Sequence, residues 1–120
     1  MTDLTRRQVV LGLTAMALMP ASARAHHGWG SYDSGTTLTL NGTVRESAYS
    51  NPHGELKLAT TDKEWICTLA PPFRMQNRGL TEDMLKPGTT CTVVGYPSKN
   101  NPSEMRAERI IVAGKTVELR

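Results

Sequence analysis

Three histidines, His26, His27 and His53, are the side chains in this chain best suited to bind a transition metal. The first two directly follow Ala23-Arg24-Ala25, a small-x-small site at which a leader peptidase is expected to cut. A cut after Ala25 would make His26 the first residue, so that its α-amine and its Nδ1 could chelate one ion while His53 supplied a third nitrogen. Nitrogen donors in a square-planar or T-shaped array suit Cu(II). The sequence therefore predicts copper as a cofactor, bound by His26 and His53. His27 is expected to be an alternative ligand or to lie in the outer shell of the site.

This pattern resembles the histidine brace of copper oxygenases and of several periplasmic copper carriers, and the resemblance covers only His26 and His53. A second small-x-small site, Ala21-Ser22-Ala23, leaves another cut open. Cleavage there would expose Arg24-Ala25-His26, which is similar to the amino-terminal copper and nickel motif, where an amine, two amides and an imidazole surround the metal. The plainer interpretation is a terminal histidine pair without a role and a turn histidine that caps a carbonyl group.

The segment that precedes these histidines is typical of an export signal. Thr5-Arg6-Arg7-Gln8 stands before an apolar run from Val9 to Met19, and Pro20 ends that run. The paired arginines make residues 1–25 look like a twin-arginine leader, which the translocase reads and signal peptidase removes. The apolar run is too short to span a bilayer, which takes about 20 residues. We therefore expect a periplasmic protein with no stable membrane insertion after cleavage.

Charge and cysteine content narrow the function further. The full chain has a net charge of +3, but residues 1–25 hold three arginines and one aspartate, so the remaining 95 residues hold 11 basic and 10 acidic side chains. This near-neutral balance is not that of a nucleic-acid binder or of a polybasic membrane surface. Cys67 and Cys91 are the two cysteines, and in an oxidising compartment they could form a disulfide or remain buried thiols.

Period-two alternation indicates that residues 37–120 form a single mostly β domain, after an irregular arm over residues 26–36. The expected strands begin at Leu38, Glu55, Trp65, Thr90, Arg106 and Thr116. Pro71-Pro72 is expected to end the third strand, residues 73–80 are polar with isolated Phe73, Met75 and Leu80, and Thr81 is expected to cap a short helix that ends at Pro87-Gly88. Three strands, a helix and then further strands predict an all-β fold with one short helix, a small OB-like antiparallel β-barrel. The alternative is a small β-sandwich.

Two other groups of residues could bind a partner. Alternation along Ser103 to Ile110 would place Arg106 and Glu108 on one face and Ala107 and Arg109 on the other. This charged segment is expected to form a lattice of opposite charges between strands, although either arginine could instead contact an anion. The aromatic residues Trp65, Tyr49 and Tyr96 could line a barrel face that binds a peptide, a glycan or an envelope protein without metal, or they could pack in the core. No nucleophile elbow or paired carboxylate site is visible, so an enzyme is not expected, although a single copper could support redox chemistry.

The remaining motifs resemble those of an uncharacterised family of small exported bacterial proteins. Such proteins begin with His-His-Gly-Trp, and the chain also carries Tyr32-Asp33, Leu40 to Val44, Asn51-Pro52-His53 and Arg106 to Ile110 at the matching places. The resemblance implies a periplasmic β-barrel domain of unknown activity. The pair Cys67 and Cys91 is not part of that pattern, so the resemblance implies no disulfide.

Overall fold

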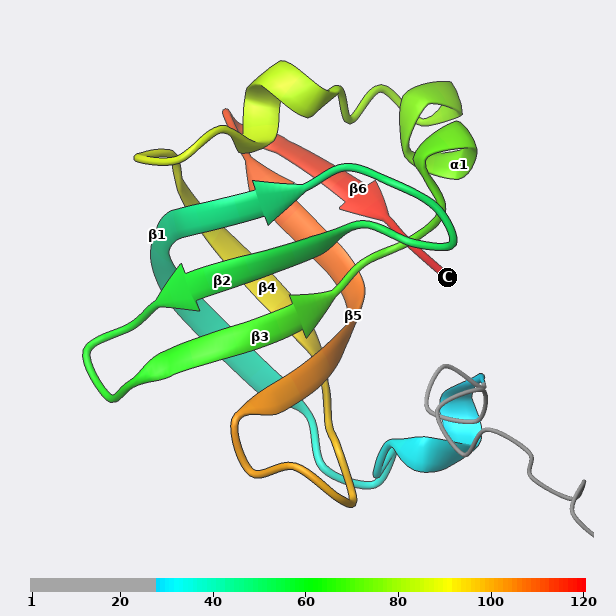
Figure 1. The fold of residues 1–120 in the computed structure, drawn as a ribbon, viewed down its shortest axis with the longest axis vertical. Coiled ribbons are helices and arrows are strands. Elements are labelled where there is room, and N and C mark those ends of the chain that lie inside the picture. The colour runs from blue at the N-terminus through cyan, green and yellow to red at the C-terminus, as the bar shows by residue number, and fades with distance from the viewer. Residues whose placement is uncertain (1–27) are drawn as a thin grey trace, which may run out of the picture.

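The computed structural model describes residues 28–120, which form one closed β-barrel with a short helical segment across one end (Figure 1). The elements, in chain order, are the 3₁₀ helix η3 (Trp29–Ser31), β1 (Leu38–Ala48), β2 (Glu55–Ala59), β3 (Glu64–Thr68), α1 (Pro72–Asn77), the 3₁₀ helix η4 (Glu82–Leu85), β4 (Thr90–Pro97), β5 (Glu104–Val112) and β6 (Lys115–Glu118). Residues 28–120 contain no helix long and apolar enough to cross a bilayer.

The long strand β1 bends so that its two halves pair with different neighbours. Residues from Leu38 to Thr43 pair with β4, and residues from Thr43 to Ala48 pair with β2, both antiparallel. Gly42 sits at this bend, where a Cβ atom would lie 2.4 Å from the backbone oxygen of Ala59, so the close approach of β1 and β2 needs a glycine. The sheet runs β3-β2-β1-β4-β5-β6, and a parallel pairing of β3 with β5 completes the ring.

This topology confirms the expected OB-like barrel, with one difference in detail. Every strand pair is antiparallel except the closing pair, where Ile66, Cys67 and Thr68 lie opposite Glu104, Met105 and Arg106. β6 lies outside the five-stranded ring as an extension of β5. Within the described chain all strands belong to one sheet, so the alternative of two packed sheets was wrong.

The core fills the inside of the ring with aliphatic side chains from alternate positions. The burial pattern of β2 and of the first half of β4 has the period of two that the sequence predicted. Fully buried members come from every barrel strand, and they include Val44, Leu56, Leu58, Cys67, Val93, Met105 and Ile110. Met75, Leu80 and Leu85, from the helical segment, are also fully buried and close one end of the barrel.

The helix lies earlier in the chain than the sequence predicted. The α-helix is Pro72–Asn77, ahead of the helix that we expected after Thr81, and the segment after Thr81 forms only the 3₁₀ turn η4. Pro72 occupies the start of α1, where its missing N–H is not needed and its fixed φ suits a helix. The side chain of Thr81 makes no capping hydrogen bond. The proline pair therefore starts a helix instead of only ending a strand.

A bulge in β5 overturns the expected alternation of its charged residues. The β4–β5 register shifts between Val94 and Gly95, and Glu108 on β5 is the residue left out of the pairing. Ala107 remains inside the barrel, but Arg109 moves to the outer surface and Ile110 takes the inner position. The prediction that Ala107 and Arg109 share a face was wrong, because one extra residue inverts the alternation beyond it.

Candidate functional site

The predicted metal ligands are only partly placed by the structure. His26 and His27 lie outside the described residues 28–120. His53 is half-buried in the turn that connects β1 to β2, with its Nδ1 3.4 Å from the carbonyl oxygen of Gly54. Among residues 28–120, no three His, Cys, Asp or Glu side chains gather in a way that could hold a metal ion. A copper site built from His53 would therefore need ligands from the segment before Gly28.

The arm that leads from those histidines into the barrel is attached at several points. The backbone N–H of Asp33 donates to the carbonyl oxygen of Pro97 at 2.9 Å, and that of Lys99 donates to Ser31 at 2.9 Å. The hydroxyl of Tyr32 donates to Oε2 of Glu104 at 2.6 Å. Burial, followed by this contact with Glu104, raises the pKa of Tyr32 to about 12. The arm is thus fixed against the loop between β4 and β5.

Trp29 forms the outermost attachment of this arm. The guanidinium carbons of Arg106 and Arg120 each lie 4.4 Å from the centroid of its indole ring. Tyr96 meets the same ring edge-on, with centroids 6.1 Å apart. Cation–π contacts of this kind contribute about 0.5–1 kcal/mol each at exposed sites. We call Trp29, Arg106 and Arg120 the arginine–tryptophan cluster.

The cluster concentrates positive charge around Arg106. Burial is the main cause that lowers the pKa of Arg106; Tyr32 partly opposes it, and the nearby cations Arg74 and Arg120 lower it further. The Nε of Arg106 is buried and has no hydrogen-bond partner among the described residues. Arg120, in contrast, forms an ion pair with Glu108, since its Nη1 lies 3.6 Å from Oε1 of that residue. Arg106 is therefore a half-buried cation whose Nε is shielded from solvent and which has no anionic partner among residues 28–120.

The two arginines that the sequence singled out on β5 have different surroundings. The Nε of Arg109 donates to Oε2 of Glu118 on β6 at 2.8 Å. That hydrogen bond raises the pKa of Arg109. This is the expected pairing of opposite charges between neighbouring strands, and solvent screening leaves such an exposed pair little effect on stability. Arg106, in contrast, has no acidic partner among residues 28–120, so the other interpretation from the sequence, contact with an anion, still applies to it.

The aromatic residues that could have formed a binding face lie apart in different environments. Trp65 is only 8% exposed and belongs to the core, with the Lys63 ammonium 4.4 Å from its ring centroid. Tyr49 packs against the core, and its hydroxyl donates to the carbonyl oxygen of Leu80 at 2.5 Å. The ring of Tyr96 packs edge-on against that of Trp29. Core packing therefore accounts for Trp65 and Tyr49.

A shallow groove nevertheless runs beside Trp65. Its volume is about 530 Å³, and it lies between the first half of β1 and the turn after β2. The lining residues are Leu38, Thr39, Leu40, Asn41, Thr60, Thr61, Asp62 and Trp65. The first half of β1 pairs only with β4, so its other backbone edge faces this groove.

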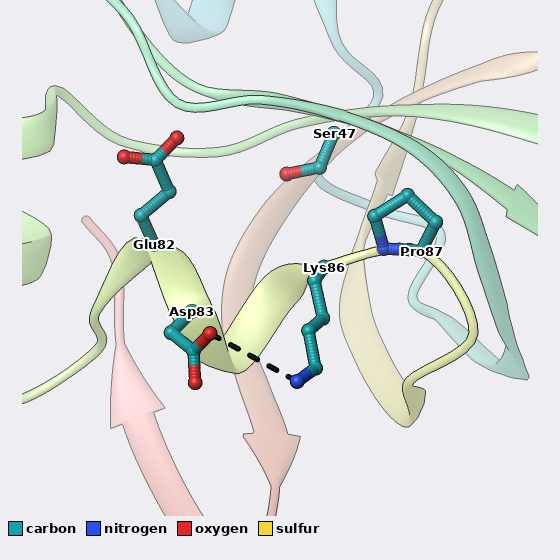
Figure 2. A pocket seen from close by; sticks show the side chains of 5 residues that line it. All are labelled: Ser47, Glu82, Asp83, Lys86 and Pro87. Atoms are coloured by element: carbon teal, nitrogen blue, oxygen red, sulfur yellow. Dashed lines mark ion pairs between the residues drawn. The ribbon is translucent and has the colours of Figure 1, made fainter.

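A second hollow lies between the end of β1 and η4, and its chemistry is that of an ordinary surface. Figure 2 shows Asp83 and Lys86 turned toward one another, at 3.9 Å, while Glu82 extends elsewhere. The side chains of Asp83 and Lys86 are largely exposed. An exposed i,i+3 pair contributes little, and no desolvated charge stands in this hollow.

Both cysteines are buried as free thiols on neighbouring parts of the barrel wall. Burial is the main cause that raises the pKa of Cys67 to about 12 and that of Cys91 to about 11. A thiol whose pKa is raised in this way is a poor nucleophile and a poor metal ligand, because both roles need the thiolate. Of the two interpretations that the sequence left open, the structure favours small buried hydrophobic side chains.

Comparison with known proteins gives one family and one fold. Residues 14–106 match the model of a family of unknown function, DUF6152. No curated protein matches the chain. Among solved structures, the crystal structure of TiaS in complex with an isoleucine tRNA and ATP matches with 21% identity and a TM-score of 0.50, over 74% of this chain and 20% of that chain.

A ZRD-deleted mutant of TiaS in complex with agmatine matches with 20% identity and a TM-score of 0.49, over 73% of this chain and 25% of that chain. The chain thus spans at most a quarter of the TiaS chains that it matches. At this identity the likeness to the tRNA complex shows the fold alone.

Proposed function

The chain belongs to the DUF6152 family of unknown function, and we propose that it is an exported periplasmic β-barrel protein that binds one Cu(II) ion at its mature N-terminus. In this proposal the leader over residues 1–25 is removed after export, His26 supplies its α-amine and imidazole, and His53 supplies the third nitrogen. His27 stands beside these ligands. The role that fits such a site is a copper carrier or sensor without catalytic activity.

The observation that carries the proposal is the attachment of the arm through Trp29. His26 precedes Trp29 by three residues, and three residues span at most about 11 Å. Trp29 itself is held by Arg106 and Arg120, so a ligand three residues ahead of it is tied by this length of chain to an anchored residue. An anchored terminus loses less conformational entropy on binding a metal than a free one.

A chain of contacts connects Trp29 with the turn that carries His53. The N–H of Gly54, the residue after His53, donates to the carbonyl oxygen of Ala70 at 2.8 Å, just before α1. Arg74 of α1 donates to the carbonyl oxygen of Leu119 at 3.1 Å, and the next residue, Arg120, lies against Trp29. In Figure 1 the β1–β2 turn, α1, η3 and the C-terminal end lie on the same side of the barrel.

The order of events follows from the chemistry of the amine. The α-amine of His26 does not exist until the leader is cut, so a brace that uses it can take up copper only outside the cytoplasm. Neutral nitrogen donors bind Cu(II) more tightly than other divalent first-row ions. Binding also competes with protons, because both imidazoles and the amine must be deprotonated. Copper retention should therefore weaken as the pH falls.

The proposal is tested by native mass spectrometry of protein recovered from the periplasm, before and after one equivalent of Cu(II) and a competing chelator. A chain that starts at His26 and keeps one copper supports the brace. A chain that starts at Arg24 and keeps copper would move the ligands to Arg24-Ala25-His26 and release His53. Copper lost to the chelator at either terminus would overturn copper binding.

Variants separate a defined site from a histidine that binds copper loosely. His53→Ala should weaken Cu(II) binding at least tenfold, whereas His27→Ala, the matched control, should change it much less. Thermal unfolding of both variants establishes that the barrel is intact. Peroxide production from copper and a reductant, measured on the same samples, would support redox catalysis instead of carriage.

The groove beside Trp65 supports a second candidate function, a metal-free binding module for a peptide, a glycan or an envelope protein. Its volume of about 530 Å³ falls in the range of small-ligand pockets. A peptide could also pair with the unpaired backbone edge of β1. Capture of a partner from the periplasm that His53→Ala does not change, and that Leu40→Asp abolishes, would favour this function over copper.

A further inference from the structure

We propose that Arg106 and Arg120, held against Trp29, form a binding site for an oxyanion, either a carboxylate or a phosphate group. Both guanidinium carbons lie 4.4 Å from the centroid of one ring, so they can be no farther apart than twice that distance. Two cations held against one ring repel one another, and an anion that binds beside them relieves the repulsion. Guanidinium groups present forked N–H donors that match the geometry of both kinds of oxyanion.

The hydrogen bonds of the neighbouring arginines distinguish Arg106. Arg74 donates to the backbone carbonyl oxygen of Leu119. Arg78 donates through Nη1 to the backbone carbonyl oxygens of Glu118 and Arg120. Arg109 pairs with Glu118. Within residues 28–120, Arg106 has no such acceptor, although it is half-buried and its Nε is shielded from solvent. A buried donor without an acceptor is costly, and native structures rarely keep one unless a further group completes the site.

Of the acidic side chains nearby, Glu104 is bound to Tyr32 and Glu108 pairs with Arg120 of the cluster itself, although Oε1 of Glu108 accepts no hydrogen bond among the described residues. Glu104 accepts the hydroxyl proton of Tyr32 at 2.6 Å, and Glu108 lies 3.6 Å from Nη1 of Arg120. The indole of Trp29 offsets part of the charge, but a ring face is not a hydrogen-bond acceptor of the strength of an oxyanion. Within the described chain Arg120 therefore has an acidic partner in Glu108, whereas Arg106 has none.

The competing explanation is that the two arginines serve only to hold Trp29 and the arm. That role predicts a contribution to stability but no saturable ligand binding, so a titration separates the two. The oxyanion site does not depend on copper. The titration is therefore made on the exported protein after treatment with a chelator and removal of that chelator, and its result is independent of the copper experiments.

The test is a titration with inorganic phosphate, and separately with succinate, at constant ionic strength, followed by the NMR signal of the Trp29 indole N–H. The expected result is a saturating shift of that signal with little change at Trp65. Arg106→Gln should weaken the affinity at least tenfold, and the matched control Arg109→Gln, on the same strand, should change it less than twofold. The tighter of the two ligands identifies the source as a phosphorylated or a carboxylated molecule.

Three results would overturn the proposal. They are a shift that stays linear with both ligands, an equal shift at Trp65, and unchanged affinity in Arg106→Gln. If Arg106→Gln does not fold, Arg106→Lys replaces it, because it keeps the charge and removes the fork. Several-fold weaker binding is then expected. Full affinity in Arg106→Lys would overturn the assignment.

Discussion

Replacement of Gly95 by alanine should disrupt the barrel at the point where it positions Arg106. Gly95 lies on β4 opposite Ala107, at the bulge that follows Val94. A Cβ atom at this position would lie 2.0 Å from the carbonyl oxygen of Arg106 and 2.8 Å from the Cα of Ala107. Both are backbone atoms, so no side-chain rotation relieves the overlap. β5 would have to move away from β4.

The size of the effect follows from this geometry. Added atoms in a well-packed interior cost about 1–3 kcal/mol, and an overlap with backbone alone belongs at the upper end, about 3 kcal/mol. Small domains have a free energy of unfolding of only about 5–15 kcal/mol, so this is a large fraction. With a urea m-value of about 1–2 kcal/mol/M, the midpoint of unfolding should fall by about 1.5–3 M.

Urea unfolding monitored by circular dichroism measures this change, with Gly30→Ala as the control. A Cβ atom on Gly30 meets nothing within 4 Å, so its free energy of unfolding should change by less than about 0.5 kcal/mol. If Gly95→Ala unfolded at the same urea concentration as Gly30→Ala, the close approach of β4 and β5 would not be a packing requirement. The bulge would then have to form without any need for a glycine opposite it, and the reasoning would be refuted.

The cluster, the core and the buried thiols lead to the remaining stability predictions. Trp29→Ala removes the ring shared by two guanidinium groups and should lower the free energy of unfolding by about 1–2 kcal/mol in urea; an unchanged midpoint would mean that the ring contributes nothing. Leu58→Ala, at a fully buried position, should cost about 2–5 kcal/mol in the same assay, and a loss below about 1 kcal/mol would contradict a tight core. Because burial raises the pKa of Cys67 to about 12 and that of Cys91 to about 11, iodoacetamide at pH 8 should modify both only in denaturant, as intact mass would show. For the same reason the free energy of unfolding should be constant up to about pH 8, should begin to fall as the unfolded thiols ionise around pH 9, and should keep falling as the pH rises toward 11–12; a rise in the urea midpoint between about pH 9 and 10.5 would contradict this sign.

The strands were predictable because one face of the barrel sheet is buried in the core and the other is exposed to solvent. Leu56 and Leu58 on β2, and Cys91 and Val93 on β4, alternate with more exposed neighbours, and that alternation is visible in the sequence. The position of a helix between the third and fourth strands was also enough to favour an OB-like barrel over a sandwich. In both cases the prediction depended on patterns that can be read along the chain without knowing which strands pair.

The helix α1 could not be found in the same way, because it has only six residues. That is less than two turns, too short for a period of 3.6 to repeat. Its one fully buried side chain, Met75, looked isolated in the sequence. The useful signal was Pro72, since proline is favoured at the first helical position, and it was interpreted as a strand end instead.

The bulge in β5 is a property of two strands, and this explains why the arginines were hard to assign. Arg106 and Arg109 look alike in the sequence, within one charged run. The extra residue at Glu108 turns Arg109 outward toward Glu118, while Arg106 lies ahead of the bulge and faces the arm. Whether an arginine is paired or left without an acceptor is thus decided by the register of its partner strand, which no local pattern records.

Trp29 connects the proposed copper site with the proposed oxyanion site through a physical dependence that can be tested in one variant. His26 stands three residues before it in the sequence, and the ring of Trp29 contacts both Arg106 and Arg120. Trp29→Phe keeps an aromatic ring of weaker quadrupole, so it should weaken arm attachment without a cavity as large as that of alanine. If the arm matters for copper, this variant should lose copper to a chelator faster than the wild type, with phosphate absent. If the chelator removes copper equally fast from both, the anchored arm is not what holds the metal, and the copper site would have to be a property of the terminal residues alone.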